Sequence, residues 1–263
     1  MSTTVPGRRA GAPRLSAVHL AALAAGVLAG LLVWRIGLPD VHVWDTTLTA
    51  LTVPTALTVG AGAGVVVIAV TSHRAWRVVD MTVAAVLAVA GGLFLWGMNA
   101  AWLPLTTPIG KVYPPLPALL NGVWILPGVL TGLIVRKPGA ALFGETVAGA
   151  VEALTGGLWG FTSLYYGIVE GLGVELVFAL LLYRRYGPVA AMAAGAGGGV
   201  ALSVLDLTFY FTDYPAGQKL AYVLLSVLSC IVIAGLGGWA LARALAATGA
   251  LAPLSSGRAA QRV

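Results

Sequence analysis

The chain has 263 residues, of which 59% are hydrophobic and 9% are charged, whereas roughly 25% of an ordinary soluble domain is charged. This composition excludes a water-soluble fold, because so much apolar sequence is needed only where lipid surrounds the protein. The net charge of +6 comes from basic residues dispersed between apolar runs, which favours membrane topology over nucleic-acid binding. The apolar runs are continuous rather than alternating, so we expect helices and not a transmembrane barrel.

Eight apolar runs predict eight membrane-spanning helices and hence an all-α polytopic membrane protein. The runs are 17–36, 47–70, 78–98, 116–135, 139–155, 162–183, 188–210 and 219–246. We interpret the first run as an uncleaved helix rather than a signal peptide, because it exceeds the usual apolar length and no A-x-A site follows it. The second run is the weakest, since threonines and glycines dilute it.

The eight predicted spans divide into two groups. Residues 1–74 hold the first two spans as an N-terminal addition, and residues 75–251 form one six-helix unit. Residues 252–263 are predicted to be a disordered cytoplasmic tail, because they are mostly small and polar. A proline-rich stretch at 99–115 predicts the longest loop between spans. This loop is a candidate lid on the outer face.

Basic residues decide the predicted orientation in the membrane. An N-terminus in the cytoplasm places twelve Lys and Arg residues inside and three outside, as the positive-inside rule requires. We therefore expect a multi-pass plasma-membrane protein with both termini in the cytoplasm. The inner residues are Arg8, Arg9, Arg14, Arg74, Arg77, Arg136, Lys137, Arg184, Arg185, Arg243, Arg258 and Arg262, and the outer ones are Arg35, Lys111 and Lys219.

Acidic residues within the predicted spans are candidates for function, because an ionisable group in the bilayer core is costly. Seven residues separate Glu145 from Glu152, so these two share one helix face. Glu170 and Glu175 differ by about 140° around their helix and face different neighbours. The five candidate residues are Glu145, Glu152, Glu170, Glu175 and Asp206.

Aromatic and amide side chains gather in the predicted outer half, beside several of these acids. Carboxylates next to aromatic rings suit a flat, cationic ligand that is rich in hydrogen-bond donors. The alternative is an interfacial aromatic belt, with the carboxylates bonded to neighbouring helices. The aromatic and amide residues are Asn99, Trp102, Asn121, Trp124, Trp159, Tyr165 and Tyr166.

Several chemistries have no support in the sequence. No P-loop occurs, and the three histidines are scattered over the N-terminal addition, so we predict neither ATP binding nor a histidine-rich metal or catalytic site. We expect no catalytic residue and no cofactor, and we interpret Cys230 as a packing residue. Ala84, Ala88 and Gly92 form a small-xxx-small stripe, which serves either bundle packing or the docking of another membrane subunit.

Residues 113–251 resemble the YkoE family of substrate-binding S components of energy-coupling factor (ECF) transporters, which take thiamine or its hydroxymethylpyrimidine precursor. The resemblance rests on RKPGAAL at 136–142, on Glu145 and Glu152 in GETVAGAVEALTG, on GIVEGLGVE at 167–175, on Asp206 and on AATGAL at 246–251. It implies six helices, an outward-opening site and no ATPase activity in this subunit. It also implies a coupling transmembrane (T) subunit and cytoplasmic ATP-binding cassette (ABC) ATPase subunits as partners.

The resemblance also gives a role to the small-residue stripe, because the first helix of such components typically docks through small residues. Cobalt and nickel components of this transporter class carry an N-terminal histidine motif that is absent here, which disfavours metal transport. Residues 1–74 lie outside the resemblance and have no predicted function.

We therefore predict a membrane-embedded subunit of an ATP-driven importer that captures thiamine or its precursor without catalysis. The predicted polar contacts are Glu152 and Glu170, the predicted stacking residues are Trp159 and Tyr166, and the predicted supporting residues are Asn99, Asn121, Glu145 and Tyr165. Two alternatives stay open. One is a proton-coupled secondary transporter of a small cationic or heteroaromatic solute, and the other is a purely structural membrane subunit.

Overall fold

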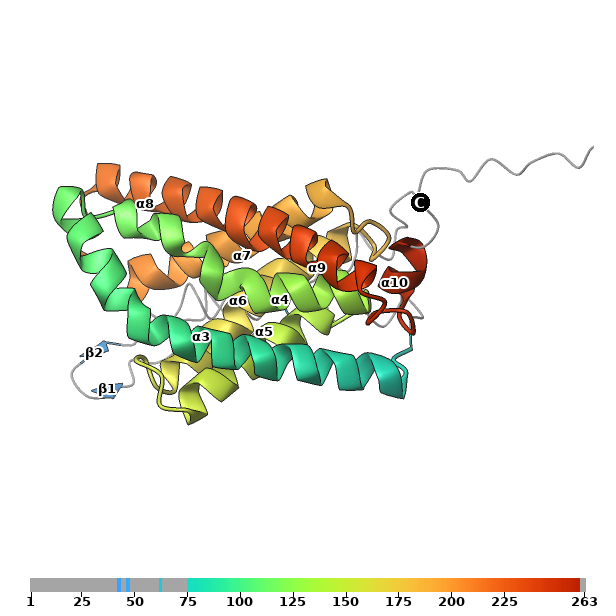
Figure 1. The fold of residues 1–263 in the computed structure, drawn as a ribbon. Coiled ribbons are helices and arrows are strands. Elements are labelled where there is room, and N and C mark those ends of the chain that lie inside the picture. The colour runs from blue at the N-terminus through green and yellow to red at the C-terminus, as the bar shows by residue number, and fades with distance from the viewer. Residues whose placement is uncertain (1–41, 44–45, 48–61, 63–74, 261–263) are drawn as a thin grey trace, which may run out of the picture.

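A computed structural model describes residues 42–43, 46–47, 62 and 75–260 (Figure 1). The predicted spans 17–36 and 47–70 therefore lie outside the described residues, apart from Thr47 and Gly62. In that region two short strands, β1 (His42–Val43) and β2 (Thr46–Thr47), pair in antiparallel register. Gly62 is helical, and a Cβ atom added to it would lie 4.0 Å from Leu172 Cδ2.

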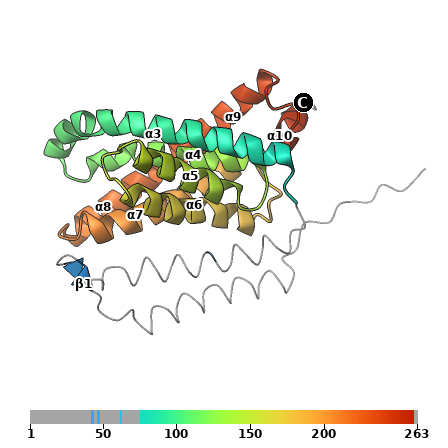
Figure 2. The ribbon, with the colours of Figure 1, turned by 90° about the horizontal axis from the view of Figure 1, so that it is seen from below.

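From residue 75 onward the described chain is an elongated helical bundle (Figures 1 and 2). The predicted six-helix unit is confirmed, with its last helix built from α8, a π-helical segment η3 and α9. A short 3₁₀ helix, η2, leads into α4. The elements are α3 (Val78–Val112), η2 (Leu116–Leu120), α4 (Gly122–Val135), α5 (Ala140–Leu154), α6 (Thr162–Leu180), α7 (Pro188–Phe209), α8 (Ala216–Ser229), η3 (Cys230–Gly237), α9 (Gly238–Ala247) and α10 (Ser255–Ala260).

Five helical stretches among the described residues are long and apolar enough to cross a membrane. They are α3, η2 with α4, α6, α7, and α8 through α9. The sixth helix, α5, has 15 residues and lies between α3 and α6. The close packing of α5 on α6 requires glycine at Gly167, because a Cβ atom there would lie 2.7 Å from the carbonyl oxygen of Glu145. Cys230 is fully buried in the core of the bundle, as its surroundings in the sequence predict.

The predicted loop at 99–115 is wrong over most of its length, because α3 continues to Val112 and contains Pro104 and Pro108. A proline removes one backbone donor and bends a helix, but it does not end a membrane helix whose remaining backbone groups are paired. Figure 1 shows α3 bending away from its first axis before it reaches η2. Only a short connection therefore joins the two elements.

The stripe of small residues on α3 lies inside the bundle. Ala84 and Ala88 are fully buried, and a Cβ atom on Gly92 would lie 2.6 Å from the carbonyl oxygen of Ala148 in α5. This position corrects the prediction of a partner-docking face at these three residues, because α5 already occupies it. The large apolar side chains that α3 exposes, such as Val86 and Leu93, come from another face of the helix.

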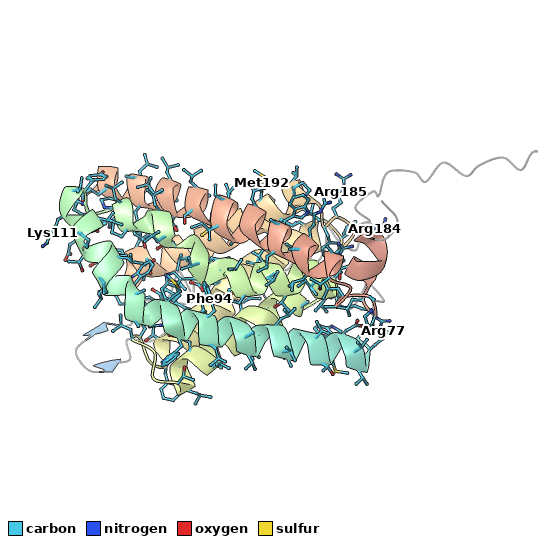
Figure 3. All side chains as sticks on the ribbon, in the orientation of Figure 1. Arg77, Phe94, Lys111, Arg184, Arg185 and Met192 are labelled. Carbon is cyan, nitrogen blue, oxygen red and sulfur yellow. The ribbon has the colours of Figure 1, made fainter. Side chains whose placement is uncertain are left out.

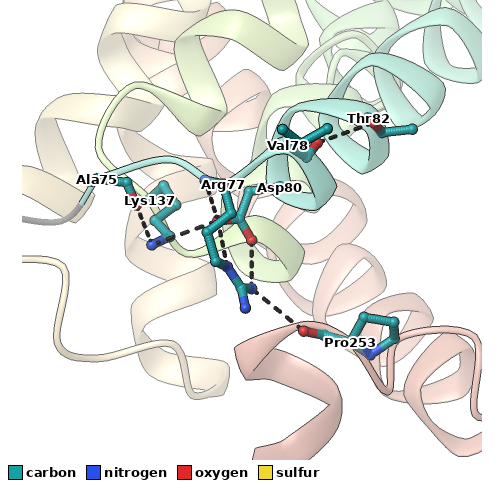
Figure 4. A network of polar contacts seen from close by, with 7 residues as sticks. All are labelled: Ala75, Arg77, Val78, Asp80, Thr82, Lys137 and Pro253. Carbon is teal, nitrogen blue, oxygen red and sulfur yellow. Dashed lines mark hydrogen bonds and ion pairs between the residues drawn. The ribbon is translucent and has the colours of Figure 1, made fainter.

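Polar contacts fix the beginning of α3 to the turn between α4 and α5 (Figure 4). Asp80, which is 1% exposed, pairs with Arg77 at 2.8 Å and with Lys137 at 3.6 Å. The hydrogen bond that Arg77 donates to Asp80 is the largest cause that raises the pKa of the Arg77 guanidinium, and the negative charge of Asp80 raises this pKa further. Lys137 also donates to the carbonyl of Ala75, and Trp76 donates to the carbonyl of Pro138. Asp80 is thus fully engaged in holding two segments together.

The segment after α9 is folded where the structure describes it, which differs from the predicted disordered tail. Helix α10 spans Ser255–Ala260, and Leu251 and Leu254 are buried in a cluster that contains Ala84 of α3. Arg77 donates to the carbonyl of Pro253, as Figure 4 shows. Leu251 and Leu254 help to anchor this segment, because each one buries apolar area against the bundle.

Candidate functional site

A cavity of about 360 Å³ lies among the helices of the bundle. Its walls come from the end of α3, the beginning of α4, the end of α5, the beginning of α6, the end of α7 and the beginning of α8. In an up-and-down bundle these six termini meet at one end. The lining residues are Leu95, Trp102, Leu103, Asn121, Trp124, Glu145, Gly149, Glu152, Leu158, Trp159, Thr162, Ser163, Tyr166, Gly167, Glu170, Leu202, Asp206, Tyr210, Phe211 and Tyr222.

The cavity lies toward the end of the bundle that carries Lys111. Figure 3 shows Lys111 at this end and Arg77, Arg184 and Arg185 at the opposite end. The predicted division of basic residues between two sides therefore agrees with the arrangement of these four in the fold.

Three tryptophans form an aromatic wall. Trp124 lies between the other two, with ring centroids 5.0 Å from Trp102 and 5.1 Å from Trp159, and all three pairs meet edge to face. This arrangement is favourable for aromatic rings, and it joins α3, α4 and the α5–α6 connection. The wall offers apolar, polarisable surface to a flat ligand.

Glu152 is held by donors from two other segments. Its Oε1 atom accepts from Asn99 Nδ2 at 2.9 Å and from Ser163 Oγ at 3.0 Å. Asn99 also accepts from the backbone N–H of Leu158 at 2.7 Å. Glu152 therefore ties α3, α5 and α6 together at the cavity wall, and Asn99 stands behind it as a supporting residue.

Asp206 is the centre of a second polar network. It accepts from Tyr166 at 3.1 Å through one oxygen and from Tyr222 through the other. Asn121 in turn donates to Tyr222 at 2.9 Å and to Ser226 at 3.1 Å. Both oxygens of Asp206 are thus engaged by tyrosine hydroxyls, and the network fixes the orientation of both tyrosine rings in the wall.

Glu145 and Glu170 occupy the same cavity with different surroundings. Glu145 Oε2 accepts from the backbone N–H of Gly128, which directly follows Pro127 within α4. Glu170 is 4% exposed, yet its Oε1 atom has no hydrogen-bond donor among the described residues. A buried polar atom without a partner is costly. Glu170 therefore offers the cavity an open acceptor.

Glu175, the remaining candidate acid, does not line the cavity. Its carboxylate accepts from the backbone N–H groups of Gly139 at 2.7 Å, Ala141 at 2.9 Å and Leu142 at 3.2 Å. It thereby caps the beginning of α5. Glu170 and Glu175 face different neighbours, as their angular separation predicts.

The structure brings most of the predicted site residues to the cavity wall. Tyr165 does not line it and packs against Phe209, while Asn99 acts through Glu152. The sequence did not predict that Ser163, Tyr210, Phe211 and Tyr222 line the cavity. Tyr222 had a weak signal, because it precedes Ser226 by four residues and both are polar side chains on one face of an apolar helix. The predicted residues in the wall are Asn121, Glu145, Glu152, Trp159, Tyr166 and Glu170.

Known proteins resemble this chain in sequence and in fold. The family described as the permease component of an ABC-type cobalt transport system matches residues 79–201. The putative HMP/thiamine permease protein YkoE of Bacillus subtilis (strain 168) is 30% identical over 187 residues, which cover 70% of this chain and 92% of that protein. The chain belongs to the YkoE family. A crystal structure of an S-component of an ECF transporter superposes with a TM-score of 0.67 at 29% identity, covering 72% of this chain and 94% of that one.

Membership of the YkoE family assigns this chain to the transporter S components and not to the enzymes. The family model matches residues 79–201, which run from α3 into α7, so the parts of the cavity wall that come from α3 to α6 lie in the matched region. Among the described residues no group of three or more His, Cys, Asp and Glu side chains could hold a metal ion.

Proposed function

We propose that this S component captures thiamine or its hydroxymethylpyrimidine precursor and delivers it through an ATP-driven ECF importer. The observation that carries the proposal is the open carboxyl oxygen of Glu170, buried in a cavity whose wall contains three tryptophans. The name of the Bacillus subtilis relative, an HMP/thiamine permease, supports this ligand class.

The chemistry of the cavity suits such a ligand. Both molecules carry an aminopyrimidine, whose amino group donates hydrogen bonds and whose flat ring stacks on aromatic side chains. Thiamine adds a positively charged thiazolium ring, which a carboxylate and the faces of tryptophan rings attract. The cavity volume of about 360 Å³ lies within the range of roughly 300–1,000 Å³ that small-molecule sites occupy.

The other carboxyl groups in the wall have positioning roles in this proposal. Glu152 and Asp206 have protein donors already, so they hold the helices and the ring of Tyr166 in place. Glu170 is then the ligand contact, while Trp159 and Tyr166 stack against the rings. No group in the cavity is assigned a catalytic role.

We also infer the orientation of the protein in the membrane and the subunits that it binds. The end that carries Arg184 and Arg185 faces the cytoplasm, because positive charge favours that side, and the cavity then faces outward. A T subunit couples the bundle to cytoplasmic ABC ATPase subunits, which hydrolyse ATP. The lipid bilayer surrounds the exposed apolar faces.

Calorimetric titration tests the binding step. The purified protein in detergent is titrated with thiamine and, separately, with the hydroxymethylpyrimidine precursor. We expect sub-micromolar binding of at least one of them, and the comparison ranks the two. An absence of heat with both, on protein shown to be folded, contradicts the proposed ligand class.

An uptake assay tests the energy source. The protein is reconstituted into vesicles alone, with a proton gradient, and also together with its T and ATPase subunits plus ATP. Uptake is expected only in the second preparation. Uptake by the protein alone would instead support the proton-coupled secondary transporter.

A further inference from the structure

We infer that the cavity selects the unphosphorylated form of its ligand and excludes phosphate esters of the same molecule. This inference rests on the proposed function and adds a selectivity that follows from the charges of the wall. It concerns any ligand whose hydroxyl group can be esterified, as in thiamine and in its precursor.

The residues of the cavity wall that can carry a charge near neutral pH are all Asp or Glu. Glu145, Glu152, Glu170 and Asp206 line the cavity, and no Lys, Arg or His among the described residues joins them. The described basic residue nearest in the chain to a lining residue is Lys219, three positions before Tyr222, and it is not part of the wall. A phosphate group would therefore meet carboxyl groups without a cation to pair with.

Several neutral donors in the wall are engaged, and the others, which are the indole N–H groups of the tryptophans and the hydroxyls of Thr162 and Tyr210, carry no charge that could neutralise a phosphate. The hydroxyl groups of Tyr166 and Tyr222 donate to Asp206, and Ser163 donates to Glu152. Asn121 donates to two side chains of α8. These donors would have to leave carboxyl oxygens unpaired before they could bind a phosphate, and each such exchange is costly in a buried site.

The beginnings of α4 and α6 do not offer a phosphate site either. A helix N-terminus binds anions through its first backbone N–H groups, but in α6 the N–H groups of Thr162 and Ser163 donate to the carbonyls of Trp159 and Gly160. In α4 the N–H group of Gly122 donates to Ser229. The usual backbone route to phosphate recognition is therefore closed at both helices.

The test compares each parent compound with its phosphate ester by calorimetric titration of the full chain. The pairs are thiamine with thiamine monophosphate, and the hydroxymethylpyrimidine with its monophosphate. We expect the ester of the binding parent to bind about 100-fold more weakly or worse, because its charged phosphate group would enter a buried wall that offers no cation among the described residues. An ester that binds within threefold of its parent, or more tightly, overturns the inference and leaves the proposed function standing.

A matched variant separates charge from size. Glu170→Gln keeps the shape of the side chain and removes one acid from the wall, so it should weaken the parent and narrow the ratio between parent and ester. Tyr165→Phe, which lies outside the wall, should leave that ratio unchanged. An unchanged ratio in Glu170→Gln would contradict a charge-based exclusion. Folded protein that binds neither parent nor ester contradicts the proposed function itself.

Discussion

Buried carboxyl groups at the two ends of the bundle differ in their hydrogen-bond and ion-pair partners. At the end that carries Arg184 and Arg185, Glu175 accepts three backbone N–H groups and Asp80 pairs with Arg77 and Lys137. At the cavity end, Glu170 is as well buried but its Oε1 atom has no described donor. The same residue type thus closes a turn at one end and leaves an acceptor open at the other.

This difference shows that burial alone does not identify a ligand-binding acid in a membrane protein. Five acids in the spans were candidates because charge is costly in a bilayer. Their partners then divide them, because an acid whose oxygens are satisfied by the protein stabilises the fold, whereas an unsatisfied one is completed by a ligand. Stability and binding should therefore respond to different substitutions.

The largest expected effect is on stability, from Glu175→Gln. The amide keeps one acceptor oxygen and replaces the other with an NH2 group, so a donor would face either the backbone N–H of Gly139 or those of Ala141 and Leu142. We expect the protein to lose about 2–4 kcal/mol of stability, measured as a lower thermal unfolding midpoint in detergent. At temperatures where the variant is folded, ligand affinity should stay within about twofold of the wild type. A strong loss of affinity in that folded variant would break the division between the two ends.

The next effect is on binding, from Glu170→Gln. This change removes the charge but not the shape, so we expect ligand affinity to fall by about 1–3 kcal/mol with little change in the unfolding midpoint. Titration calorimetry and a thermal shift assay on one preparation measure both quantities. An unchanged affinity would remove Glu170 from the site.

A smaller effect is expected from Trp159→Ala, which opens the aromatic wall next to Trp124. Loss of one stacking surface should weaken binding by about 1 kcal/mol. Trp159→Phe keeps an aromatic ring and should retain part of the affinity, which separates stacking from bulk. Equal losses in the two variants would contradict a stacking role.

The smallest effect is expected from Tyr165→Phe. Tyr165 packs on Phe209 outside the cavity wall, so ligand affinity should stay within about 0.5 kcal/mol of the wild type. This variant tests the supporting role that the sequence predicts for Tyr165. A loss of affinity as large as that of Glu170→Gln would show that the cavity wall is assigned incorrectly.

The sequence predicted the six-helix unit and the acids of the spans because both depend on hydropathy, which is local along the chain. It did not predict the length of α3, since Pro104 and Pro108 bend that helix without ending it. The sequence also did not predict which neighbour the stripe of Ala84, Ala88 and Gly92 faces. A face of small residues has the same sequence signature whether it packs on α5 or on a partner subunit.

The roles of the individual acids were the least predictable part of the site. Glu152 is satisfied by Asn99, which is 53 positions earlier, and Asp206 by Tyr166 and Tyr222 from two other helices. Such pairs depend on how helices face each other and leave no periodic trace in the chain. The open acceptor at Glu170 becomes visible only after every other donor has been placed.

The role of Glu170 as the ligand contact is most directly tested by determining the structure of the protein with thiamine or its hydroxymethylpyrimidine precursor bound. We predict that the ligand fills the cavity beside Trp159, with one of its donors within about 3.2 Å of Glu170 Oε1. A ligand bound elsewhere, or one in the cavity that leaves Glu170 Oε1 without a partner, would contradict it.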